Sequence, residues 1–257
     1  MKKMVLILVI SGLLILTGGI VNEIEALSGT EILNQLDETM RADNKYMEQN
    51  MILVSAGGSE RSRDMAIWSS VENDTEKMLV RFLSPADVAG TGLLLEDDDM
   101  WLYLPALNNI RRISGSARQG DFMGSDLTYE DMEALGTAGF GDDYEADLIE
   151  EVIYEEREAF LLELKPIEAD SSYSKLEIKV DSEYWLPLKI DYYEEDEMVK
   201  TLVTSEHAEL DGRWTAQRLE MSDHREGTRT ILIVNEVDYS SEVKSEIFTT
   251  RNLERGQ

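Results

Sequence analysis

The sequence TGLLLEDDDMWLYL, residues 91–104, contains the pattern that decides the fold. Two apolar runs, residues 93–95 and 101–104, flank three consecutive aspartates, and such a break between short apolar runs is typical of two antiparallel strands joined by a turn. Neither run alternates between apolar and polar residues, so each strand must be covered on both faces. The pair predicts a sheet with its core on one face and a helix, a ligand or a partner on the other, although a well-packed sandwich with nothing bound fits the same pattern.

Strand-like stretches continue on both sides of this pair. They comprise residues 46–55, 61–70, 77–83, 91–96, 100–104 and 109–114, and then 146–154, 159–165, 173–181, 185–193, 198–208, 214–222 and 228–239. Short turns rich in Gly, Asn, Asp and Ser separate them, which predicts an antiparallel meander and not βαβ units. We therefore expect a mainly β protein with one sheet of about a dozen strands.

Two short helices are expected beside this sheet. The sequence from Ser28 to Glu31 forms a capping box, and apolar residues then recur at helical spacing, which predicts a helix over residues 29–41. A second helix is expected over residues 126–135, with Asp126 as its N-cap and Gly136 just after its end. Two detached helices and one large curved sheet predict a concave apolar face that the helices cover as a lid. Residues 27–257 are predicted to form one domain.

The composition excludes several classes of function. The chain has 257 residues, with 53 Asp and Glu against 24 Lys and Arg, so its net charge is −29 and phosphates would repel it. It contains no cysteine and only two histidines, which removes disulfides, thiolate nucleophiles and iron–sulfur clusters and leaves little for a metal site. The acidic stretches 97–99 and 141–143 do not match a calcium-binding loop. No nucleic acid, metal or cofactor is expected.

Residues 1–26 have the pattern of an export signal. Lys2 and Lys3 precede residues 4–16, of which 11 of 13 are apolar, and small residues follow at 17–19 and at Ala26. The sequence therefore predicts a protein exported from the cytoplasm, with the signal either cleaved or kept as an anchoring helix.

A set of ordered motifs resembles the LolA-like family of outer-membrane lipoprotein-sorting proteins. The motifs are FLSPADVAGTG at residues 82–92, DMWLYLPAL at 99–107, IRRIS at 110–114 and FMGSDLTYED at 122–131. The resemblance implies an incomplete antiparallel β-barrel whose concave apolar face is covered by helices. It also implies a periplasmic, non-enzymatic and monomeric protein that binds acyl chains of lipoproteins or lipids, beside an inner-membrane permease complex in some members.

Within this family interpretation, large apolar residues of the motifs are candidates for the lining of a lipid cavity. The candidates are Trp68, Phe82, Leu95, Trp101, Tyr103, Phe122 and Met123. Candidates for the lid or for contact with a lipid headgroup are Leu36, Met40, Arg111 and Arg112. The apolar residues fit an ordinary core equally, and either arginine fits an ion pair with a neighbouring carboxylate.

Two other functions stay open at this stage. The chain fits a non-enzymatic interaction or sensor module that binds a permease or an envelope regulator. A hydrolase with two catalytic carboxylates is disfavoured, because 53 acidic residues make any such pair uninformative. The sequence Gly124-Ser125-Asp126 lacks the pattern of a nucleophile elbow and is interpreted as a helix cap.

Overall fold

Thirteen antiparallel strands form one open sheet in the computed structural model, which describes residues 27–73, 75–97, 99–136, 139–168 and 171–255. The predicted export signal at residues 1–26 lies outside the described residues. The strands are β1 (Asn44–Val54), β2 (Glu60–Glu72), β3 (Thr75–Ser84), β4 (Gly92–Glu96), β5 (Asp99–Leu104), β6 (Asn109–Ile113), β7 (Tyr144–Tyr154), β8 (Arg157–Pro166), β9 (Lys175–Asp181), β10 (Pro187–Glu194), β11 (Glu197–Leu210), β12 (Arg213–Asp223) and β13 (Thr228–Asp238).

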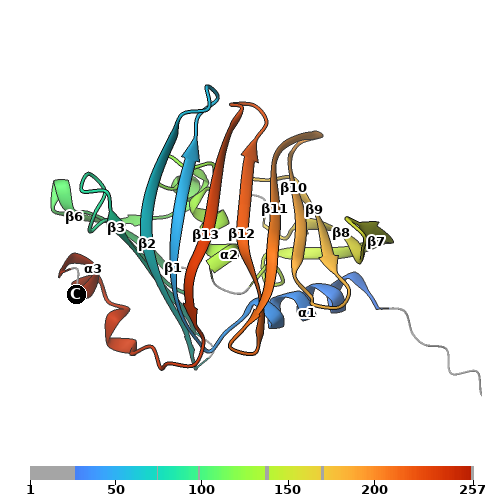
Figure 1. Ribbon diagram of the computed structural model, residues 1–257, viewed down its shortest axis with the longest axis horizontal. Helices are drawn as coiled ribbons and strands as arrows, with labels where there is room; N and C mark the ends of the chain where they lie inside the picture. The colour runs from blue at the N-terminus through green and yellow to red at the C-terminus, as the bar shows by residue number, and fades with distance from the viewer. Residues whose placement is uncertain (1–26, 74, 98, 137–138, 169–170, 256–257) are drawn as a thin grey trace, which may run out of the picture.

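The strand order confirms the predicted meander and adds one long-range pairing. The order is β6-β5-β4-β3-β2-β1-β13-β12-β11-β10-β9-β8-β7, so two meanders meet where β1 pairs with β13. The sheet curves around the short helix α2, and its edge strands β6 and β7 lie at opposite ends of the molecule (Figure 1). The fold is therefore the expected curved, incomplete barrel covered on its concave face.

The first helix forms as its sequence predicts. Helix α1 (Gly29–Met40) begins with the capping box, in which the Ser28 hydroxyl accepts from the Glu31 N–H at 3.2 Å and the Glu31 carboxylate accepts from the Ser28 N–H at 2.8 Å. Its N-terminus lies against β7 so closely that a Cβ on Gly29 would come within 2.5 Å of the Ala146 carbonyl oxygen. Glycine is therefore required where α1 meets this edge strand.

The second helix differs from its prediction at both ends. Helix α2 (Tyr129–Gly136) is capped by Thr128 and not by Asp126, because Thr128 and Asp131 form a reciprocal capping box. Gly136 is the last helical residue and has no left-handed conformation. A Cβ there would lie 2.2 Å from the Met78 sulfur. This glycine therefore permits close packing of α2 on β3 and does not have the predicted role of a residue that follows the helix end.

The remaining helical elements are short. They are α3 (Thr250–Arg255) and the 3₁₀ turns η1 (Pro105–Leu107), η2 (Gly115–Gln119) and η3 (Ser245–Ile247). Within the described ranges, no helix combines the length and the apolar character needed to cross a bilayer.

Candidate functional site: the concave face of the sheet

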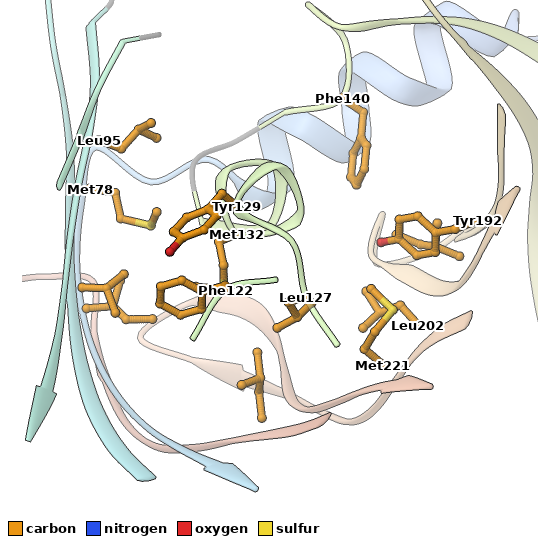
Figure 2. Packing of buried hydrophobic residues seen from close by; sticks show 14 of the residues in the cluster. Met78, Leu95, Phe122, Leu127, Tyr129, Met132, Phe140, Tyr192, Leu202 and Met221 are labelled. Atoms are coloured by element: carbon orange, nitrogen blue, oxygen red, sulfur yellow. The ribbon is translucent and has the colours of Figure 1, made fainter. Parts of the chain in front are cut away.

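The concave face of the sheet holds the main hydrophobic cluster, which we call the concave cluster. It joins buried side chains of both meanders with those of α1, α2 and the loop before α2. Figure 2 shows Phe122, Tyr129 and Met132 between Met78 and Leu95 of one meander and the strands of the other. The two walls of the half-barrel are thus connected through residues that belong to neither.

Methionine is the characteristic residue of this cluster. Two methionines, Met40 and Met123, pack against it from the side. Its buried methionines are Met47, Met51, Met65, Met78, Met100, Met132 and Met221. Because a thioether chain is unbranched and polarizable, it adapts to neighbours of different shape at little cost. The concave face is therefore lined by side chains that can repack around another apolar group.

Residues 114–136, here called the crossover segment, lead from β6 at one edge of the sheet across its concave face toward β7 at the other (Figure 1). Phe122 and Leu127 are fully buried, and Tyr129 and Met132 are 5% and 4% exposed. The Phe122 ring lies 5.7 Å from Phe82 of β3 and 5.6 Å from Tyr129, centroid to centroid. The hollow expected from the sequence is therefore filled by the protein's own side chains.

Asp126 anchors this segment to the second meander through polar contacts. Its carboxylate accepts hydrogen bonds from the hydroxyls of Thr228 and Thr230, the second at 2.6 Å. Its backbone N–H donates to the Thr230 hydroxyl at 2.8 Å, and its carbonyl accepts from the Lys200 ammonium at 2.8 Å. Asp126 is thus a tether between the crossover segment and strands β11 and β13, and not the helix cap predicted for it.

A second polar contact lies five residues further on, at Asp131 in the first turn of α2. This carboxylate is 4% exposed and accepts from the Thr128 N–H at 2.8 Å and from the Tyr173 hydroxyl at 3.1 Å. Burial raises the pKa of Asp131, while the nearby Lys200 charge and these hydrogen bonds act in the opposite direction. A buried carboxylate with partners in place fixes the start of α2 at one position.

Contacts of α1 with the residues before β7, and of the central strand β1 with α2, complete the closure. The Asp37 carboxylate of α1 accepts from the backbone N–H groups of Phe140, at 3.2 Å, and of Gly141, at 2.8 Å. Burial is the main cause that raises the pKa of Asp37 to about 6. The Lys45 ammonium of β1 donates to the Gly136 carbonyl at 3.0 Å, at the C-terminal end of α2 where a cation is favourable.

The structure divides the predicted lining residues between the two faces of the sheet. Phe82, Leu95 and Phe122 are buried in the concave cluster, and Met123 packs against it. The predicted lid residues Leu36 and Met40 also contact this cluster from α1. These residues share one buried cluster, and their role in binding a lipid stays a prediction.

The aromatic candidates Trp68, Trp101 and Tyr103 lie elsewhere, so the seven residues do not line one cavity. They belong to a separate cluster on the convex face, with Phe248 and Leu253 of the C-terminal segment, residues 239–255. Leu95 of β4 pairs with Met100 of β5, and Trp101 is the next residue after Met100. Because side chains alternate between faces along a strand, Leu95 and Trp101 project to opposite faces of the sheet. The second face of the apolar strands is thus covered by the end of the chain.

A buried arginine holds this C-terminal segment in place. The Arg81 guanidinium of β3 donates to the carbonyls of Leu253 at 2.8 Å, of Asn252 at 3.1 Å and of Gly90 at 3.1 Å. The strand pattern alone does not predict this cover, although apolar residues at 243, 247, 248 and 253 after the last strand could have indicated it.

The predicted headgroup contacts Arg111 and Arg112 lie on the edge strand β6. Both side chains are exposed, and Arg112 forms an ion pair with Asp99 of β5. An ion pair with a neighbouring carboxylate is the alternative that the sequence leaves open for either arginine. An exposed pair of this kind contributes little to stability. Ser125 is not placed as a nucleophile, because its hydroxyl donates to the Phe122 carbonyl at 2.7 Å inside the turn.

Two cavities lie beside the concave cluster, one lined in part by Tyr173 and the other by Met40. A hollow of about 430 Å³ is open to solvent between residues 166–168 and 171–174 on one side and Glu194 and Glu195 on the other, and its wall is about equally polar and apolar. A small hollow of about 10 Å³ lies beside Met40, Lys45 and Gly136. Across the described ranges, no group of three or more acidic or histidine side chains is arranged to hold a metal ion.

Comparison with solved structures defines the class of protein. The structure superposes with a TM-score of 0.72 on a LolA superfamily protein from Nitrosomonas europaea, at 21% identity over 87% of this chain and 98% of the other. The fold is therefore the LolA-like half-barrel, as the motif resemblance implied.

Closer relatives define the family. A DUF1329 family protein from Desulfovibrio piger is 31% identical over 88% of this chain and 97% of its own, with a TM-score of 0.82. A putative outer-membrane lipoprotein-sorting protein domain from Vibrio parahaemolyticus is 30% identical over 88% and 98%, with a TM-score of 0.81. A family model described only as an uncharacterized protein matches residues 74–255. The chain belongs to the DUF1329 family. No curated protein matches it.

Proposed function

We propose that this protein is a non-enzymatic periplasmic carrier that binds the acyl chains of lipoproteins or lipids against the concave face of its sheet. The observation that carries the proposal is the concave cluster itself, a methionine-rich apolar face filled by a crossover segment that the sheet does not need for its own strand pairing. The similarity to a putative lipoprotein-sorting domain supports the same function and the same compartment.

Binding requires that the crossover segment moves, because its side chains occupy the site. Four of these side chains, Phe122, Leu127, Tyr129 and Met132, are buried, and returning each one to water costs roughly 1.5–3 kcal/mol. One C16 chain offers about 15 methylenes at roughly 0.8 kcal/mol each, or on the order of 10 kcal/mol before ordering costs. One chain therefore roughly balances the opening, and a cargo with two or more chains exceeds it.

Loading measurements test the proposal. We expect the exported protein, purified from the host envelope, to retain lipid detectable by mass spectrometry and to bind a fluorescent two-chain phospholipid much more tightly than a fluorescent C16 fatty acid. Asp126→Ala removes the tether to Thr228 and Thr230 and should speed loading, whereas Asp99→Ala on β5 is the matched control and should not. Lipid-free protein that binds neither probe would refute the carrier function.

The filled concave face favours a second candidate, a non-enzymatic module that binds a partner protein such as a permease subunit or an envelope regulator. That function needs no opening of the crossover segment. Copurification of a stoichiometric partner with protein that contains no lipid, and whose recovery is unchanged by Asp126→Ala, would support this second candidate over the carrier.

A further inference from the structure

The two edge strands of the sheet carry opposite charge. In the described part of the chain, no strand pairs with the outer side of β6 or of β7. Exposed sheet edges pair readily with other strands unless charge or shape prevents it. β6 presents Arg111 and Arg112, and β7 presents Glu150 and Glu151, all four exposed. Each edge therefore repels a copy of itself and attracts the other edge.

The residues that flank these charges match as well. The sequence of β6 around its arginines is Ile-Arg-Arg-Ile, residues 110–113, and that of β7 is Ile-Glu-Glu-Val-Ile, residues 149–153. In antiparallel pairing, Arg111 faces Glu151, Arg112 faces Glu150, and Ile110 then faces Val152. Opposite charges and apolar residues across a ladder are the favourable cross-strand pairs.

The faces of the sheet agree with this register. Arg111 pairs with Leu102 of the concave cluster, and Glu151 pairs with Phe160, which packs against that cluster. Both side chains of this pair therefore belong to the concave side. Arg112 and Glu150 are their direct neighbours along each strand and belong to the convex side. A second copy joined in this register continues the sheet with its concave face on the same side.

We propose that β6 of one copy pairs with β7 of a second copy, in the register Arg111–Glu151 and Arg112–Glu150, to form head-to-tail assemblies. Figure 1 shows the two edges at opposite ends of the long axis, so each added copy leaves one edge of either kind free. Such a contact is heterologous and extends instead of closing into a dimer. The proposal does not depend on the lipid-carrier function.

The geometry also sets the strength of the contact. The α1 N-terminus approaches β7 at Ala146 and Leu148, so the free length is limited to the residues after the register shift at 148–150. To pair with Glu150 of another copy, Arg112 must give up its exposed ion pair with Asp99. Two chains of net charge −29 also repel each other until salt screens them. We therefore expect weak association, visible at high protein concentration and increasing from low to moderate salt.

Charge exchange between the edges tests the proposal by sedimentation velocity over a concentration series. R111E/R112E and E150K/E151K should each remove the association. The chain with all four changes should regain it, and so should an equimolar mixture of the two double variants. The control variants K244E/R251E and E155K/E156K alter exposed charges outside the two pairing segments and should associate like the unchanged chain.

Cysteine cross-linking tests the register, since the chain has no cysteine of its own. A mixture of I110C and V152C chains should form a disulfide-linked heterodimer on mild oxidation, because directly opposed residues in a ladder lie within about 5.5 Å. Mixtures of I110C with L148C, and each single variant alone, should not. Equal cross-linking in all mixtures, or monomers at every concentration and salt, would overturn the proposal.

Discussion

Removal of the Phe122 ring should change stability and lipid binding in opposite directions. Phe122 is fully buried and packs between Phe82 and Tyr129. Truncating a buried phenylalanine to alanine costs roughly 3–5 kcal/mol, so Phe122→Ala should lower the free energy of unfolding by about that amount. The same ring must leave the core when the crossover segment opens, which costs roughly 1.5–3 kcal/mol. The variant avoids this cost and should bind lipid roughly 10- to 150-fold more tightly.

Urea unfolding and titration with a fluorescent two-chain phospholipid measure the two effects on one preparation. Phe122→Leu is the milder companion variant and keeps the test valid if the alanine variant does not fold. Trp101→Leu is the control, because Trp101 lies on the convex face under the C-terminal segment. It should destabilise the protein without tightening lipid binding. If folded Phe122 variants bind lipid no better than the Trp101 variant, the crossover segment does not compete with the cargo.

Three further changes test the contacts around this segment. Burial raises the pKa of Asp37 from 3.8 to about 6, so the native state holds this proton more tightly than the unfolded state. The free energy of unfolding should therefore fall by up to about 3 kcal/mol as the pH rises from 4 to 6. In urea unfolding, Asp37→Asn should flatten this dependence on pH. Gly136→Ala places a Cβ 2.2 Å from the Met78 sulfur and should cost roughly 1–3 kcal/mol, whereas Gly57→Ala, whose nearest atom is 4.0 Å away, should be nearly neutral in thermal unfolding. Arg81→Met leaves the carbonyls of Asn252 and Leu253 unpaired, so limited proteolysis should remove the C-terminal segment faster than it does in Arg251→Ala.

The sequence predicted the sheet well because each strand carries its own local signal. Apolar stretches and turn residues placed the strands within a few residues of their observed bounds, and the capping box at Ser28 fixed the start of α1. The pairing of β1 with β13 could not be read from periodicity, because strand pairing across most of the chain depends on tertiary packing.

The candidate site was predicted only in part. The runs without alternation indicate that residues 93–95 and 101–104 are covered on both faces of the sheet. They do not indicate which face is covered by the crossover segment and which by the C-terminal segment. Leu95 and Trp101 were therefore grouped together, whereas the structure places them on opposite sides. Asp126 was misassigned as a cap because its partners, Thr228 and Thr230, lie about a hundred residues away and leave no mark in the local pattern.

The meeting of β1 and β13 in the middle of the sheet has a consequence for the newborn polypeptide. The first six strands can pair with one another as they are made, but β1 keeps an open side until β13 has emerged nearly 180 residues later. Throughout that interval the half-built molecule exposes apolar surface that only its final third can cover. The order of strands therefore makes the interval between the synthesis of β1 and that of β13 the period in which this protein most needs protection from aggregation.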